Sequence, residues 1–237
     1  MNLASKVLSF FFPELCHSCG SPLTHSESLF CVECRKNLKR VQAYCRRCGE
    51  LFSEELPSFL EEKELYGCRL CQKENVYLDR VFLGFQYAEP ISTLIEKAKF
   101  GGDFVLAYKL GRLFRLILPS LPVEYDLACA VPLSVERLKQ RGYNQAEIML
   151  WGYLGKRPKN DPLKRVKNTR PQTELSRKER LQNVKSAFEA KSDLSGLKVL
   201  LFDDVMTTGA TLRECAKALK KAGAKEVVAL VLARACY

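Results

Sequence analysis

The segment Val199-Leu-Leu-Phe-Asp-Asp-Val-Met-Thr-Thr-Gly-Ala-Thr211 joins a run of apolar residues to a run of acidic, hydroxylic and small ones. Residues 199–202 are all apolar, which is typical of a strand in a parallel sheet covered on both faces. Helix-forming residues follow at 212–222, Gly223 is placed to end that helix, and residues 227–233 form a second apolar run. The segment therefore predicts an α/β fold, with a parallel sheet and helices on both of its faces.

The loop between the first strand and the helix carries the groups that a sugar phosphate requires. In open α/β sheets the ligand lies beyond the carboxyl ends of the strands, where a helix N-terminus offers unpaired N–H groups to a phosphate. The carboxylates of Asp203 and Asp204 can accept hydrogen bonds from two adjacent ribose hydroxyls. The alternative is an ordinary strand, loop and helix with a surface acid pair. The candidate phosphate-binding residues are Thr207, Thr208, Gly209, Ala210 and Thr211.

The whole stretch resembles the phosphoribosyl pyrophosphate (PRPP) signature of type I phosphoribosyltransferases. That signature is a hydrophobic strand, two acids and then Thr-Thr-Gly-x-Thr. The resemblance implies that Asp203 and Asp204 hold the ribose hydroxyls and act in catalysis, and that residues 207–211 bind the 5-phosphate. The sequence contains neither a Gly-x-x-x-x-Gly-Lys-Thr nor a Gly-x-Gly-x-x-Gly motif, which disfavours nucleoside triphosphatase and dinucleotide-binding functions.

The composition favours a folded cytoplasmic protein with a basic surface. Of its 237 residues, 47% are hydrophobic, yet no apolar run reaches the roughly 18 residues that a membrane span needs. The apolar stretch at residues 7–12 is too short for a signal peptide and predicts an amphipathic element. The formal net charge of +11 falls to about +7 if eight thiolates bind two Zn²⁺ ions, which still favours a polyanionic partner.

Eight of the eleven cysteines fall into four Cys-x-x-Cys pairs, and the first and third pairs are each followed by glycine. This repeat predicts sequential pairing into two closed tetrahedral zinc sites with a structural role. Redox dithiols and an iron–sulfur cluster are the alternatives. Each predicted site takes one glycine-ended pair and the plain pair after it: Cys16, Cys19, Cys31 and Cys34 for one, and Cys45, Cys48, Cys68 and Cys71 for the other.

The cysteine-rich region is expected to form a double zinc ribbon at residues 1–78, and residues 79–237 are expected to form the α/β domain. Several basic residues lie between the zinc sites, and either a nucleic-acid contact or a solvated basic face explains them. His17 and His25 are the only histidines, and we expect both to be exposed rather than ligands. No histidine remains for general-base chemistry in the larger domain.

Two further segments match positions in a phosphoribosyltransferase site. Residues 126–131 predict a second buried strand, and the resemblance implies that the loop after it meets pyrophosphate. The basic region at residues 156–191 suits the mobile hood loop of these enzymes and equally suits a phosphodiester backbone. The residues assigned to the pyrophosphate loop are Pro132, Leu133, Ser134 and Arg137, and those assigned to the hood are Arg170, Gln172 and Arg177.

Taken with the cysteine pairs, Val-Pro-Leu…Arg-Gly-Tyr-Asn-Gln (131–145) and Thr-Arg-Pro-Gln-Thr-x-Leu-Ser-Arg-x-x-Arg (169–180) resemble the ComF family. These are double zinc-ribbon, phosphoribosyltransferase-like proteins of bacterial DNA uptake. The resemblance implies Mg²⁺-dependent PRPP binding, a role with single-stranded DNA in natural transformation, and a helicase-like partner. Three hypotheses follow: a phosphoribosyltransferase, a non-catalytic nucleic-acid-binding factor that senses a nucleotide-like ligand, or a scaffold with a vestigial pocket.

Overall fold

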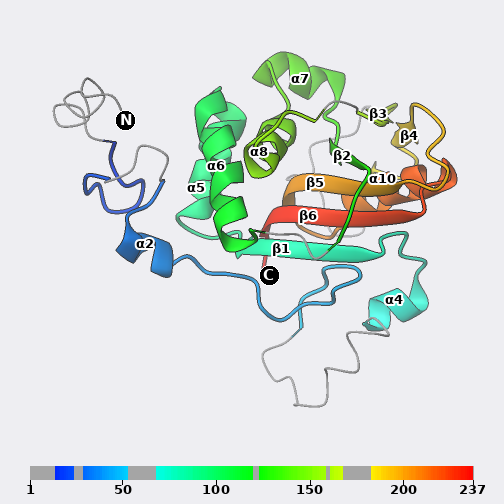
Figure 1. Ribbon diagram of the computed structural model, residues 1–237, viewed down its shortest axis with the longest axis horizontal. Coiled ribbons are helices and arrows are strands. Elements are labelled where there is room, and N and C mark those ends of the chain that lie inside the picture. The colour runs from blue at the N-terminus through cyan, green and yellow to red at the C-terminus, as the bar shows by residue number, and fades with distance from the viewer. Residues whose placement is uncertain are drawn as a thin grey trace.

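A four-stranded parallel sheet forms the centre of the molecule (Figure 1). The computed structural model describes residues 14–23, 29–52, 68–119, 123–158, 161–167 and 183–236. The strands are β1 (Arg80–Gln86), β2 (Leu127–Ala130), β5 (Lys198–Met206) and β6 (Glu226–Arg234), in the spatial order β1-β6-β5-β2. The apolar runs predicted to be strands at 199–202 and 227–233 pair in parallel as β5 and β6. The predicted parallel α/β sheet is therefore confirmed.

Helices cover both faces of the sheet, as the unbroken apolar runs require. Three helices, α5 (Ile91–Phe100), α6 (Phe104–Ile117) and α8 (Gln145–Leu154), pack on the face that holds Leu200 and Phe202. The opposite face, which holds Val199 and Leu201, packs against α10 (Ala210–Lys221) and the antiparallel pair β3 (Leu163–Arg165) and β4 (Phe188–Ala190). The short helix α7 (Val135–Arg141) follows β2 at the carboxyl edge of the sheet.

The cysteine-rich region packs along the free edge of β1. It contains the short helices α2 (Val32–Lys36) and α4 (Arg69–Lys73). Between them, Arg40 forms an antiparallel bridge with Phe85. The Gln86 N–H donates to the Lys39 carbonyl at 2.8 Å, and the Val81 N–H donates to the Arg46 carbonyl at 2.6 Å. Because these bonds use backbone groups that an exposed edge strand would leave unpaired, the ribbon protects the sheet from pairing with another chain.

The two cysteine tetrads lie against different parts of the core. Cys16 belongs to the apolar cluster that α5, α6 and α8 form with the sheet. Cys45, Cys48 and Cys71 belong to the other cluster, with α10 and Val81. The division into domains at residues 78 and 79 remains a proposal, since the ribbon and the sheet share both clusters.

Several predicted features lie outside the described residues. These are the amphipathic element at 7–12, His25, and the hood residues Arg170, Gln172 and Arg177. Within the part of the chain that the structure describes, no helix is both long enough and apolar enough to cross a membrane.

Helices α6 and α8 cross at two glycines, and this crossing gives a test of the fold. A Cβ atom on Gly111 would overlap the Met149 carbonyl oxygen, and one on Gly152 would overlap the Tyr108 carbonyl oxygen. Helix propensity alone predicts that Gly111→Ala stabilises the protein by about 1 kcal/mol. We expect the opposite, a loss of about 1–3 kcal/mol, because the helices must separate. Denaturant unfolding measures the sign, and a gain in stability would contradict this crossing.

Candidate functional site

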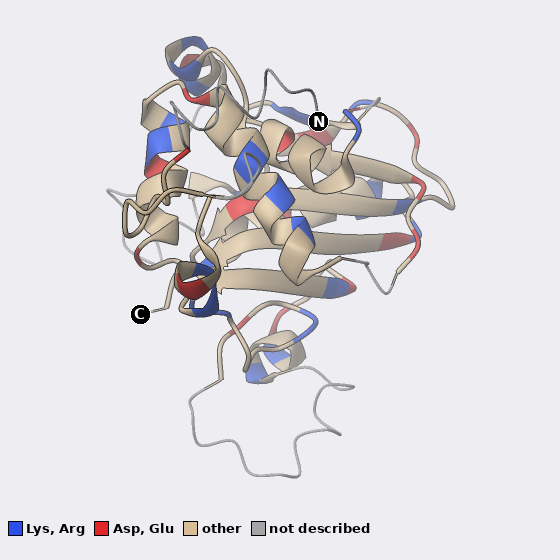
Figure 2. Ribbon diagram, turned by 60° about the vertical axis from the view of Figure 1, so that its left-hand side comes forward, with Lys and Arg blue, Asp and Glu red and all other residues tan. Residues whose placement is uncertain are grey.

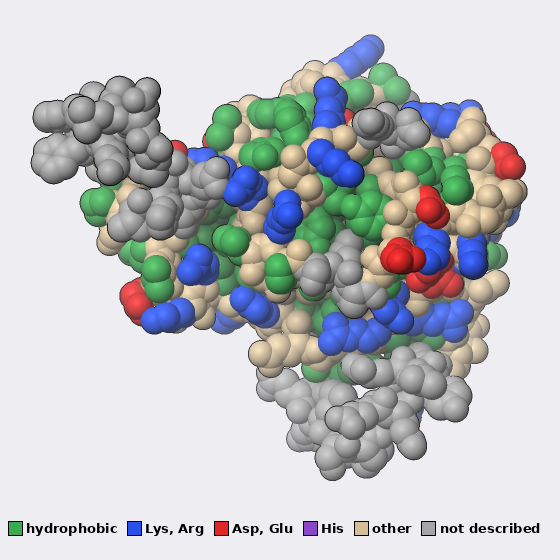
Figure 3. Space-filling model, viewed as in Figure 1, with side chains coloured by type: hydrophobic (Ala, Val, Ile, Leu, Met, Phe, Trp, Pro, Cys, Tyr) green, Lys and Arg blue, Asp and Glu red, His purple; other side chains and the backbone are tan. Residues whose placement is uncertain are grey.

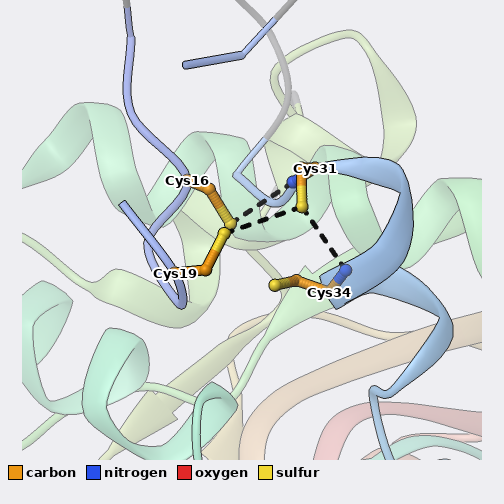
Figure 4. Close-up of side chains that lie close together, drawn as sticks. All are labelled: Cys16, Cys19, Cys31 and Cys34. Atoms are coloured by element: carbon orange, nitrogen blue, oxygen red, sulfur yellow. Dashed lines mark hydrogen bonds between the residues drawn. The ribbon is translucent and has the colours of Figure 1, made fainter. Parts of the chain in front are cut away.

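Two cysteine tetrads have the geometry of zinc sites. Figure 4 shows Cys16, Cys19, Cys31 and Cys34, whose side chains converge. In each tetrad the four sulfur atoms all lie within 4.8 Å of one another. A tetrahedral site with Zn–S bonds of about 2.3 Å requires S···S separations of about 3.8 Å. The Sγ atoms of Cys19 and Cys31 are 3.8 Å apart, as are those of Cys45 and Cys71. The residues fit the metal, and the structure groups the sulfurs in the sequential order that the sequence predicts.

The turns around the sulfurs show the same repeat that the sequence predicts. Gly20 and Gly49 have φ angles of 72° and 73°, a region that glycine adopts without steric cost. Their N–H groups donate to the carbonyls of Cys16 and Cys45, at 2.9 and 2.8 Å. The Cys31 N–H donates to Cys16 Sγ at 3.4 Å, which stabilises a thiolate there. His17 is exposed, as expected.

A cavity of about 410 Å³ opens at the carboxyl edge of the sheet. It brings together seven of the eleven described residues that the sequence assigned to a PRPP site, although they come from distant segments. Gly209 and Ala210 line an adjoining recess at the start of α10, which Asp203, Thr207 and Thr211 also line. The predicted residues that line the cavity itself are Pro132, Leu133, Arg137, Asp203, Asp204, Thr207 and Thr211.

Two predicted residues have structural roles beside the cavity. Ser134 is buried, and its hydroxyl accepts the Arg137 N–H at 3.4 Å, so it caps α7. Thr208 is also buried, and its Oγ1 accepts the Ala210 N–H at 3.3 Å. This N–H is therefore already bonded within the loop, whereas the prediction left it free for phosphate. Gly209, with φ of 73°, turns the chain into α10 and directs the helix N-terminus toward the recess.

Asp204 is a buried carboxylate with several partners. Its Oδ2 accepts a hydrogen bond from Gln145 Nε2 at 2.9 Å and lies 3.2 Å from the ammonium of Lys99. Its Oδ1 accepts the Val205 N–H at 2.7 Å. Burial by itself would raise the pKa of Asp204, but the Lys99 charge and these hydrogen bonds hold it below its usual value. Asp204 is therefore ionised at neutral pH.

Asp203 occupies a different environment, although it is the adjacent residue. It is partly exposed and lines both the cavity and the recess. Desolvation and the neighbouring charge of Asp204 raise the pKa of Asp203 well above its usual value. Figure 2 shows the acidic segment at the end of a strand, with basic residues on nearby helices. A cation or a hydrogen-bond donor placed in the cavity would stabilise the ionised form of the Asp203 carboxylate.

Cations outnumber carboxylates around the cavity. Lys99, Arg137, Arg141 and Arg165 all line it. Burial lowers the pKa of the Arg141 guanidinium, and the charge of Asp204 partly offsets that effect. Four cations against three carboxylates, those of Glu96, Asp203 and Asp204, leave the lining with a net positive charge, which suits an anionic ligand.

Sequence reasoning did not single out three of the lining residues, Lys99, Gln145 and Arg165. Gln145 is the last residue of the Arg-Gly-Tyr-Asn-Gln motif, so that motif could have identified Gln145 as a candidate site residue. Its Oε1 is buried and has no hydrogen-bond partner among the described residues. A buried acceptor of this kind costs free energy until a donor reaches it.

A second cavity, of about 490 Å³, lies between β2, α8 and the residues Arg157, Pro158 and Asp161. Its charges are already matched: Arg157 pairs with Glu147 at 3.2 Å, and Asp161 pairs with Lys191 at 2.9 Å. The smaller cavity, with its carboxylates and excess cations, is therefore the better candidate for a sugar phosphate.

Comparison with known proteins matches both parts of the chain. The family model described as "Phosphoribosyl transferase domain" matches residues 156–235, and "Double zinc ribbon domain" matches residues 7–73. The fold and the cysteine sites thus define a double zinc-ribbon protein with a phosphoribosyltransferase-like domain.

Curated relatives cover nearly the whole chain. "Competence protein F" of Haemophilus influenzae is 35% identical over 95% of this chain and 99% of its own length. "DNA utilization protein YhgH" of Salmonella typhi is 30% identical over 94% of this chain and 97% of its own length. "Competence protein ComFC" of Bacillus subtilis is 28% identical over 81% of this chain and 78% of its own length. The chain belongs to the ComF family.

The opposite pKa shifts of the two aspartates give a pH-dependent prediction. The destabilisation from Asp203 is absent below the ordinary pKa of 3.8, grows as the pH rises from there toward its raised pKa, and is complete above that raised pKa. Asp203→Asn should therefore raise Tm at pH 8, by about 2–4 °C for each kcal/mol relieved, and the gain should vanish near pH 4.

Asp204→Asn is the matched comparison. The pKa of Asp204 is lowered, so its ionised form stabilises the fold above its ordinary pKa, and that contribution is lost in acid. This variant should lower Tm at pH 8 and approach wild type in acid. Thermal unfolding of both variants from about pH 2 to pH 8 measures the signs, because the Asp204 contribution is lost only below the ordinary pKa of 3.8, and equal shifts for the two would refute the assigned environments.

Proposed function

We propose that this ComF-family protein binds PRPP with Mg²⁺ in the cavity at the carboxyl edge of the sheet, and that it assists the uptake of single-stranded DNA in natural transformation. One observation carries the proposal. The cavity unites two carboxylates, a Thr-Thr-Gly-Ala-Thr loop at a helix N-terminus and an excess of cations. Each of these groups matches a different part of a phosphorylated ribose that carries pyrophosphate.

The ligand would lie across the edge of the sheet from the start of α10 toward α7. Its 5-phosphate would occupy the recess formed by Thr207–Thr211, where helix N–H groups favour an anion. The ribose hydroxyls would donate to Asp203 and to the unpartnered Oε1 of Gln145. Pyrophosphate would lie near Pro132 and Leu133, with Arg137 and Arg141 neutralising it. The hood residues Arg170, Gln172 and Arg177 keep their proposed role of closing over the ligand.

The partly exposed carboxylate of Asp203 fits Mg²⁺, which prefers oxygen ligands and shares them with substrate phosphates. When bound, Mg²⁺ supplies positive charge that neutralises the pyrophosphate leaving group. The chain itself orients the ribose and stabilises the charge that develops as pyrophosphate leaves a carbon of oxocarbenium character. Neither histidine of the sequence lies in residues 79–237, so transfer to a nitrogenous acceptor would rest on positioning and electrostatics.

Support for the DNA role comes from the relatives and from the surface. The relatives' names refer to competence and DNA utilization. Figure 3 shows a face on which Lys and Arg side chains predominate over Asp and Glu. In the ribbon, Arg35, Lys36, Lys39, Arg40 and Arg47 are exposed. We propose that such a surface holds phosphodiester backbone in the cytoplasm, alongside a competence helicase.

A non-catalytic nucleic-acid-binding factor is the second candidate, and Phe100 favours it. This side chain is 76% exposed at the rim of the cavity, an unusual position for a large apolar group. The Arg141 guanidinium lies 5.0 Å from its ring centroid. An exposed aromatic ring beside cations is the arrangement on which single-stranded nucleic acids stack their bases.

The first prediction here concerns the ligand. Calorimetric titration of PRPP into the protein should show binding that requires Mg²⁺, and Asp203→Asn should abolish it because the cavity loses the charge of its partly exposed carboxylate. Asp161→Asn is the matched control, since Asp161 pairs with Lys191 in the other cavity. Zinc content should stay the same in both variants. Undiminished binding by Asp203→Asn would overturn the site assignment.

The second prediction concerns DNA. Phe100→Ala should weaken the binding of a short single-stranded oligonucleotide about tenfold, the loss expected for one stacked base. Leu116→Ala removes another exposed apolar side chain, from α6, and should leave affinity unchanged. Fluorescence anisotropy at two salt concentrations measures both. Salt-sensitive DNA binding without any PRPP binding would favour the non-catalytic factor over the transferase.

A further inference from the structure

Arg234, the last residue of β6, joins the cysteine-rich region to the phosphate loop. It is buried, with 5% of its surface exposed. Its Nε donates to the Gly49 carbonyl at 3.2 Å, and Gly49 directly follows the zinc ligand Cys48. Its Nη1 donates to the carbonyls of Met206, at 3.3 Å, and of Thr207. One guanidinium therefore bonds the second knuckle and the start of the phosphate loop at the same time.

The chemistry of this position requires arginine. A guanidinium presents five N–H donors in a rigid plane, so it can bond several carbonyls that face it from different segments. Nη1 also donates to the Ala235 carbonyl at 2.8 Å, and Nη2 lies 3.9 Å from the Glu50 carboxylate. Lysine would offer one point charge in place of this fork. A shorter or apolar side chain would leave buried carbonyls of the knuckle and the loop unpaired.

Packing of Met206 connects the same two segments independently of Arg234. A Cβ atom on Gly49 would lie 2.9 Å from the Cε and Sδ atoms of Met206. A Cβ atom on Gly209 would lie 2.5 Å from Met206 Cε and 3.8 Å from the Cys48 carbonyl oxygen. Both glycines thus leave room for the methionine between the knuckle and the loop. The loop that would hold phosphate is packed directly against a zinc-ligand turn.

We propose that the zinc site of Cys45, Cys48, Cys68 and Cys71 positions the phosphate loop, with Arg234 as the connecting residue. A metal at this site would hold the Cys48–Gly49 turn in place. The Gly49 carbonyl in turn orients the Arg234 guanidinium. The guanidinium then holds the Thr207 carbonyl, and the loop of Thr207 carries the N–H groups proposed to bind phosphate. This inference rests on the proposed function for its ligand, but the connection itself does not depend on a ligand. It gives the second zinc site a role in binding beyond that of holding the fold.

The other tetrad supplies an internal control. Cys16 packs in the core cluster of α5, α6 and α8, away from α10. Losing that metal should cost stability without loosening the loop. Cys19→Ser and Cys48→Ser each remove one ligand, from the first and second site respectively, and each should lower the zinc content from two ions to one per chain.

The first measurement needs no ligand. Hydrogen exchange followed by mass spectrometry should show faster exchange of the peptide that covers residues 205–211 in Cys48→Ser, and no change there in Cys19→Ser. Isothermal titration with PRPP and Mg²⁺, and with ribose 5-phosphate as the phosphate probe, should show affinity about tenfold lower in Cys48→Ser only, a typical coupling between two sites.

Arg234 variants test the connection with both metals in place, which matters if Cys48→Ser fails to fold. Arg234→Met should retain two zinc ions, exchange faster at residues 205–211 and bind both probes about tenfold more weakly. Arg234→Lys should recover only part of the loss. Tyr44→Phe is the matched control: the Tyr44 hydroxyl accepts the Leu83 N–H at 3.2 Å, so it links the ribbon to the sheet away from the loop.

The outcomes separate this inference from the proposed function. Loop exchange in Arg234→Met and Cys48→Ser that equals wild type would overturn the connection, whatever the protein binds. Faster loop exchange in a protein that binds neither probe would support the connection and refute the PRPP proposal. Equal effects of Tyr44→Phe and Arg234→Met would reduce Arg234 to a general contact of the interface and overturn its positioning role.

Discussion

Burial of β5 on both faces is the constraint on which the rest of the structure depends. A strand between β6 and β2, with helices above and below, can place polar groups only at its end. Side chains alternate between the faces, so Asp203 and Asp204 enter opposite environments. Asp204 meets Lys99 and Gln145 on the face of α5 and α8, whereas Asp203 faces the recess at α10. Because of this alternation, two identical side chains have opposite pKa shifts: the pKa of Asp204 is lowered and that of Asp203 is raised.

The cysteine-rich region extends this architecture rather than standing apart from it. A segment of this size has too little core to fold alone, so metal ligation and packing on β1 supply its stability. In return it occupies the free edge of β1 and places the Cys48–Gly49 turn against Met206. The edge of the sheet and the phosphate loop are therefore both completed by residues that precede the α/β domain in sequence.

Local patterns in the sequence predicted several helices and strands and the cysteine pairs. The features that the sequence did not predict depend on contacts between distant segments. The strand at 199–202, the glycine after α10 and the pairing of the cysteines all follow from residues within one segment or one repeat. The order of the strands and the pairing of the ribbon with β1 depend on segments far apart in the chain. The same holds for Lys99 and Arg234, whose surroundings come from other elements. Gly142, with φ of 76°, ends α7 before α8 begins.

The energetics of the cavity argue against a vestigial pocket. Asp203 carries a pKa raised by burial and by Asp204, so its ionised form costs stability at neutral pH. Gln145 buries an acceptor that no described residue satisfies. Four cations and three carboxylates line the same space, so the lining carries a net positive charge that a ligand with several negative charges would offset. A single substitution could remove each of these costs in stability without disturbing the sheet. Residues that lower stability in this way are found mainly at functional sites. A ligand with hydroxyl groups and several negative charges would offset all three of these costs, which is the physical reason to regard the cavity as a functional site.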